Sequence, residues 1–186
     1  MKDELTGKWL FWMKTGIAAT LVLVVAVLRI LPHPWNFTPI GAMALFSGSV
    51  FRDKWQKFLF PLIALFAGDV VVGFHKLMFV VYLSFMVSVV LGIWVGENRK
   101  PLRIAGAALF GAIQFFLITN FAVWTTFTTY PRTSAGLVAC YTAAVPFFWN
   151  TLAGDMLYTT LLFGGYALAE RYLPHSGQLE QSIRSK

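Results

Sequence analysis

The chain alternates long apolar runs with short polar connections. Runs of about 20 apolar residues are long enough to cross a bilayer as helices. Prolines and charged clusters separate the runs, and proline cannot continue a helical hydrogen-bond ladder. The pattern predicts an all-α protein, a polytopic membrane bundle of about six transmembrane helices at residues 16–31, 39–51, 58–74, 78–96, 104–124 and 149–170.

Two apolar segments depart from this simple pattern. Residues 39–51 are short for a full crossing and rich in glycine, alanine and serine, which allow helix backbones to approach closely. We expect a tilted or partly buried helix there. Residues 135–148 are apolar but are interrupted by Pro146, which favours a short interfacial or re-entrant helix before the sixth span.

The composition supports the membrane class. The chain is 58% hydrophobic and 12% charged, whereas soluble domains carry about 25% charged residues. We predict a cytoplasmic N-terminal segment at residues 1–15, a transmembrane domain at 16–171 and a cytoplasmic tail at 172–186. Leu31-Pro-His-Pro34 follows the first run in place of a small-residue cleavage site, so we expect that run to be retained.

The distribution of lysine and arginine predicts the orientation. All but three of the 15 basic side chains fall on the side of the membrane that holds the N-terminus, the exceptions being Arg29, Lys76 and Arg132. Cytoplasmic loops carry such an excess, so both termini are predicted to be cytoplasmic. This clustering between apolar runs accounts for the net charge of +7 without a nucleic-acid partner.

Four polar side chains interrupt the apolar runs: Asp69, Asn120, Asn150 and Asp155. A central Asp costs about 2.5–3.5 kcal/mol on insertion scales, so such residues face a bundle interior, a partner or a cavity. At about 1.5 Å per residue, all four are predicted to lie within roughly 10 Å of the outer boundary.

The outer connections add further candidate residues. Asn36 and His75 lie in predicted outer loops, and Trp124 ends the fifth run, where its ring could stack on a flat ligand. Together with the four buried polar residues they predict an outward-opening pocket that binds a small-molecule solute.

Structural roles for the same residues stay open. Asp69 and Asp155 suit a cation site or a proton relay, but each could instead cap a helix break or pair with a neighbouring polar group. Asn120 and Asn150 suit ligand binding and interhelical hydrogen bonding equally.

The sequence does not predict an enzyme. It contains no nucleophile with a matched base, no Walker loop and no dinucleotide fingerprint. His33, His75 and Cys140 lack the spacing of metal ligands, so neither a metal nor another cofactor is predicted.

Several segments together resemble a bacterial family of uncharacterised membrane proteins. The resemblance covers about residues 16–171 and rests on LPHPWNFTPIGAMALFSG at 31–48, ITNFAVW at 118–124, YPRTSAGLVACY at 130–141 and PFFWNTLAGD at 146–155. That family looks like the substrate-binding S components of energy-coupling factor (ECF) transporters.

The resemblance implies a subunit of the bacterial inner membrane that captures a small nutrient from outside. S components work with an energising module, made of a coupling subunit and two ATPases. Many of them carry small residues at four-residue spacing in the first span, where this chain offers only Gly16 and Thr20. Two alternatives therefore remain, a self-sufficient proton- or cation-coupled carrier and a structural or assembly protein without transport activity.

Overall fold

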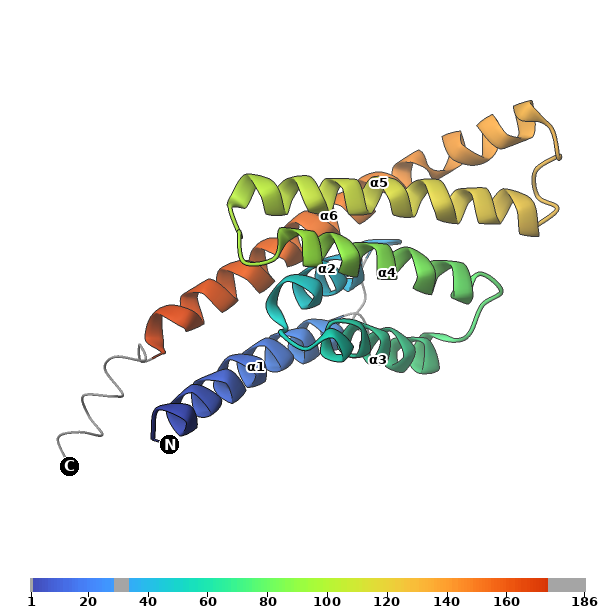
Figure 1. Cartoon of the computed structure of the whole chain (residues 1–186). Helices are drawn as coiled ribbons and strands as arrows, with labels where there is room; N and C mark the ends of the chain where they lie inside the picture. Colours follow the sequence, from blue (N-terminus) through green and yellow to red (C-terminus); the bar gives the residue numbers. More distant parts are fainter. Residues whose placement is uncertain (1, 29–33, 174–186) are drawn as a thin grey trace.

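A computed structural model describes residues 2–28 and 34–173 of the chain, with side chains for residues 7–27 and 34–173. All regular structure in these ranges is helical. The six helices are α1 (Lys2–Leu28), α2 (Ile40–Val50), α3 (Lys54–Val72), α4 (Met78–Val95), α5 (Pro101–Thr126) and α6 (Ser134–Tyr172) (Figure 1). The predicted all-helical class is thereby confirmed.

Five of the helices are long and apolar enough to span a membrane. Their outward faces carry large apolar side chains at helical spacing. Ile63, Phe66 and Val70 on α3 are more than half exposed. Residues three or four apart lie on one helix face, so this row forms an apolar stripe suited to lipid. These features indicate an integral membrane protein.

Helix α2 occupies the centre of the bundle. Nearly all its side chains are buried, and it contacts each of the five other helices. Its 11 residues span only about 16 Å, roughly half the thickness of the hydrocarbon core. The expectation of a short, buried second helix is confirmed.

Two segments at predicted boundaries are helical in the structure. The predicted N-terminal segment at residues 1–15 is helical from Lys2, as the first half of α1. The predicted break at 135–148 is wrong, because α6 runs unbroken through Pro146 for 39 residues, about 58 Å.

Packing against α5 stabilises α6 on both sides of its proline. The Tyr141 hydroxyl donates to the Leu117 carbonyl at 2.7 Å. The Phe116 ring contacts the rings of Tyr141 and Phe148 at centroid distances of 5.5 and 5.2 Å. Neighbouring helices allow a transmembrane helix to tolerate proline, and α5 supplies that support.

The basic side chains gather at one end of the bundle. Figure 1 shows the start of α1, the α2–α3 and α4–α5 connections and the end of α6 at the same end. We call this the basic end, defined by Lys8, Lys14, Arg52, Lys54, Lys57, Arg99, Lys100, Arg103 and Arg171. The opposite end, at the α3–α4 and α5–α6 connections, carries Lys76 and Arg132.

Helices α2 and α4 cross at two glycines. A Cβ added to Gly48 would collide with the carbonyl oxygen of Val89, and one added to Gly92 would collide with that of Leu45. The opposing atoms are backbone, which cannot move aside as a side-chain tip can. Close backbone approach of this kind is what small residues permit between membrane helices.

Substitution of either crossing glycine is therefore expected to destabilise the bundle. Gly48→Ala or Gly92→Ala should lower the free energy of unfolding by about 1–3 kcal/mol, the usual cost of overpacking. The matched control is Gly106→Ala on α5, where an added Cβ has open space. Unfolding of the three variants in detergent tests this, and equal stability of all three would contradict a tight crossing.

Candidate functional site

A short stretch of α6 holds the chain that leads into α2. The side-chain amide of Asn150 donates to the carbonyl of Trp35 at 2.9 Å. One turn further along, a Cβ on Gly154 would lie only 3.2 Å from the Thr38 nitrogen, so the two backbones are in close contact. Residues 34–39 are thereby fixed against α6.

The same stretch of α6 caps α2. The residue before this helix is Pro39, whose side chain makes no capping hydrogen bond. The carboxyl group of Asp155, only 5% exposed, instead accepts a hydrogen bond from the Ala42 backbone N–H. The first N–H groups of a helix have no partner within it, and a carboxylate at that place is favourable.

Gly41 allows this approach. A Cβ on Gly41 would collide with the Asp155 carboxyl oxygens. Of the two structural alternatives considered for Asp155, capping of a helix is therefore the one that the structure displays.

A cavity of about 200 Å³ lies beside the fixed segment, between α5 and α6. A turn places Asn36 at its edge: the Phe37 N–H donates to the Pro34 carbonyl at 3.0 Å, and Asn36 has φ 62°. Asparagine tolerates this left-handed conformation better than most residues. The cavity lining is Asn36, Phe115, Phe116, Thr119, Asn120, Val123, Ala144, Phe147, Phe148 and Thr151.

The polar groups of this cavity can both accept and donate hydrogen bonds. The Asn120 amide nitrogen donates to the Phe116 carbonyl at 2.8 Å, which leaves its side-chain oxygen to accept and its second N–H to donate. The hydroxyls of Thr119 and Thr151 donate to the carbonyls of Phe115 and Phe147, so their remaining lone pairs also accept. No charged side chain lines the cavity among the described residues.

The structure does not bring Asp69 to this cavity. Asp69 is 2% exposed on α3 and accepts a hydrogen bond of 2.7 Å from the Tyr82 hydroxyl on α4. Helices α3 and α6 do not contact each other in the described part of the chain. Asp69 and Asp155 therefore have separate partners.

The remaining predicted residues, His75 and Trp124, lie at the end of the bundle opposite the basic end. His75 is exposed in the α3–α4 connection. The Trp124 indole N–H donates to the Pro131 carbonyl at 2.9 Å, and the Arg132 guanidinium lies 5.6 Å from its ring centroid. Trp124 thus packs against the α5–α6 connection. It does not line the cavity between α5 and α6.

No group of three metal-binding side chains occurs within residues 7–28 and 34–173. Cys140 is buried against α5, where its thiol contacts the Asn120 carbonyl at 3.5 Å. His33 lies outside the described residues.

A larger cavity, of about 760 Å³, lies at the basic end and is not predicted from the sequence. Its charged lining includes Arg52, Lys57, Arg99 and Glu170. The basic residues had been interpreted only as markers of orientation. Glu170 is an acidic residue near the end of the last apolar run, on the side predicted to hold the basic connections. It was the available sequence signal for a charged site at that end.

Loss of the Asp155 carboxyl group should destabilise the protein. Asp155→Ala leaves the buried Ala42 N–H without its partner, which is expected to cost about 1.5–3 kcal/mol. Asp155→Asn should cost less, because its amide oxygen still accepts. The control is Asp53→Ala, since Asp53 precedes α3 but makes no capping hydrogen bond with its side chain. Detergent unfolding measures all three, and equal effects of Asp155→Ala and Asp53→Ala would contradict the cap.

Comparisons with known proteins identify the family but no function. No curated protein and no solved structure matches the chain significantly. A family profile described as a family of unknown function, DUF6580, matches residues 10–176. That match covers nearly the whole chain, and the chain belongs to this family.

Proposed function

We propose that this protein is a membrane transport subunit that binds a small solute in the cavity between α5, α6 and residues 34–39. One observation carries the proposal: Asn36 and Asn120, far apart in sequence and both predicted to bind solute, line one cavity. Polar groups that converge on an otherwise apolar cavity are typical of ligand sites.

The lining indicates the class of solute. Four phenylalanines supply flat apolar walls, and the two asparagine amides supply both donors and acceptors. The volume of about 200 Å³ is below the roughly 300–1,000 Å³ of sites for drug-sized ligands. A compact, uncharged molecule with a flat apolar part and a few hydrogen-bonding groups fits these features, because no charged side chain lines the cavity among the described residues.

The charge distribution suggests the direction of capture. Under the positive-inside rule the basic end lies in the cytoplasm, and the solute cavity then lies in the outer half of the bundle. Both termini are then cytoplasmic and the solute enters from outside. In a bacterial inner membrane this is the arrangement expected of an S-component-like subunit of an ECF transporter.

The exposed helix surfaces indicate where such a subunit could contact an energising module. The small-residue pairs of α5, Ala107/Gly111 and Ala108/Ala112, are buried within the bundle and are not available to a partner. Gly16 on α1 is exposed and has open space around it. We therefore place any contact with an energising module on α1.

Native mass spectrometry of the protein, purified in mild detergent from cells grown in rich medium, tests the proposal. We expect a reproducible small-molecule adduct. Asn120→Ala should reduce its occupancy by a factor on the order of ten, because it removes a hydrogen-bond acceptor from the site. The fold should survive, because the Asn120 side chain otherwise bonds only within its own helix.

Asn98→Ala provides the matched control, since Asn98 is exposed in the α4–α5 connection at the basic end. An adduct that persists in Asn120→Ala would contradict this site. A protein that carries no small molecule but retains a second protein would favour the assembly alternative. Uptake that is abolished by an uncoupler and insensitive to ATPase loss would favour the self-sufficient carrier.

A further inference from the structure

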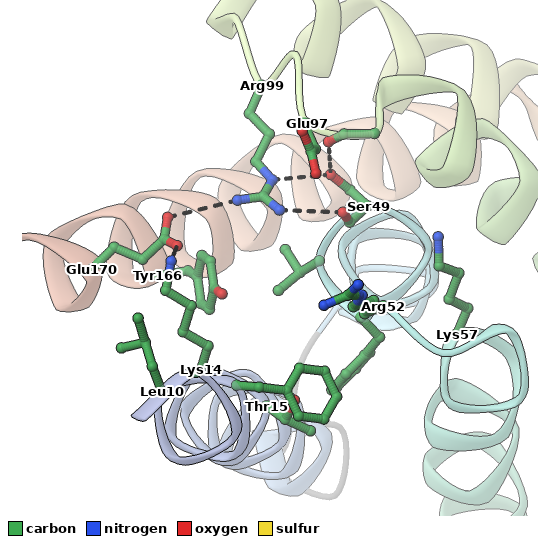
Figure 2. Close-up of a pocket in the computed structure, with 15 residues that line it drawn as sticks. Leu10, Lys14, Thr15, Ser49, Arg52, Lys57, Glu97, Arg99, Tyr166 and Glu170 are labelled. Atoms are coloured by element: carbon green, nitrogen blue, oxygen red, sulfur yellow. Dashed lines mark hydrogen bonds and ion pairs between the residues drawn. The ribbon is translucent and has the colours of Figure 1, made fainter. Parts of the chain in front are cut away.

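The cavity at the basic end has no role in the solute site described above. Its walls come from α1, from the α2–α3 and α4–α5 connections and from the end of α6, as Figure 2 shows. With a volume of about 760 Å³, it falls in the size range of established ligand sites.

One wall of this cavity is a connected polar network. The Glu170 carboxylate pairs with Lys14 at 2.9 Å and with Arg99 at 3.6 Å. Arg99 also donates to the Ser49 hydroxyl and carbonyl, both at 3.3 Å, and its guanidinium lies 5.4 Å from the Tyr166 ring centroid. These contacts connect three helices and hold the wall in one geometry.

The facing wall carries uncompensated positive charge. Figure 2 shows Arg52 and Lys57 across the cavity from Glu170. Neither makes an ion pair in the part of the chain that the structure describes. The cavity lining holds four basic side chains and two carboxylates, Glu97 and Glu170, so its formal charge is positive.

Apolar side chains complete the lining. Leu10 and Phe11 of α1 and Val50 and Phe51 of the α2–α3 region lie beside the charged groups. The site therefore offers a charged part and an apolar part. An arginine binds phosphate through its planar fork and a lysine binds it as a point charge. Basic pockets between membrane helices are suited to anionic lipid headgroups.

We propose that this cavity binds a phosphate-bearing anion, held chiefly by Arg52 and Lys57, with the Glu170–Arg99 network as the fixed opposite wall. The phosphate could belong to a phospholipid headgroup, whose glycerol and acyl carbons would lie against Phe11 and Phe51. It could equally belong to a soluble phosphate ester. The two sources share the same recognition chemistry and differ in whether an acyl chain is required.

Thermal unfolding of the full chain in detergent at low ionic strength distinguishes the two sources. The probes are dioleoyl phosphatidylglycerol, the zwitterionic dioleoyl phosphatidylcholine and glycerol 3-phosphate. A rise in unfolding temperature with phosphatidylglycerol alone identifies a lipid site, because ligand that binds only the folded protein stabilises it. A rise with glycerol 3-phosphate as well identifies a site for soluble phosphate. No rise beyond that given by phosphatidylcholine overturns the proposal.

Substitutions then test the assigned residues. Arg52→Gln and Lys57→Gln should each weaken binding of the effective probe by roughly fivefold. Lys54→Gln is the matched control, because Lys54 is exposed in the same region and does not line the cavity. Its effect should be below about twofold.

Lys57→Arg distinguishes loss of the positive charge from damage to the fold. It keeps the cation, so it should retain binding. Unchanged binding in both Arg52→Gln and Lys57→Gln would overturn the assignment. So would an equal loss in Lys54→Gln, because a general surface charge effect would then account for the result.

Discussion

The architecture depends on how a helix can begin inside a membrane bundle. Helix α2 is too short to cross the hydrocarbon, so its first N–H groups and the non-helical chain before it need partners within the protein. Helix α6 provides them: Asp155 accepts from the Ala42 N–H and Asn150 donates to the Trp35 carbonyl. Asp155 can reach the backbone because residue 41 is glycine.

This arrangement also creates the cavity of the proposed solute site. Because residues 34–39 are held against α6, Asn36 comes to lie at the edge of the space between α5 and α6, near Asn120. The two glycines at the α2–α4 crossing then hold α2 close to its other neighbour. In the sequence these residues are isolated polar interruptions or parts of small-residue runs. In the structure they act together to position residues 34–39 and α2.

The sequence predicts well which residues form apolar helices, and it predicts poorly how those helices face one another. Hydropathy places the helices, including the short second one, because the apolar requirement acts on every residue of a span. It also places Asp69 and Asp155 within spans, but not the helix that each faces. Asp69 bonds Tyr82 on the next helix, and Asp155 bonds the start of α2. The continuity of α6 through Pro146 could not be predicted, because it depends on aromatic packing against α5.

The position of α2 bears directly on how a transport subunit of this design could work. The proposed solute cavity lies away from the basic cavity, between the middle parts of α5 and α6, and α2 is buried between the surrounding helices. Displacement of α2 would break its cap on Asp155 and its close crossing with α4. Both contacts oppose that motion, since one leaves buried N–H groups unpaired and the other separates packed backbones. The proposed function therefore keeps α2 in place: the subunit holds its solute near one face, and a partner drives its passage.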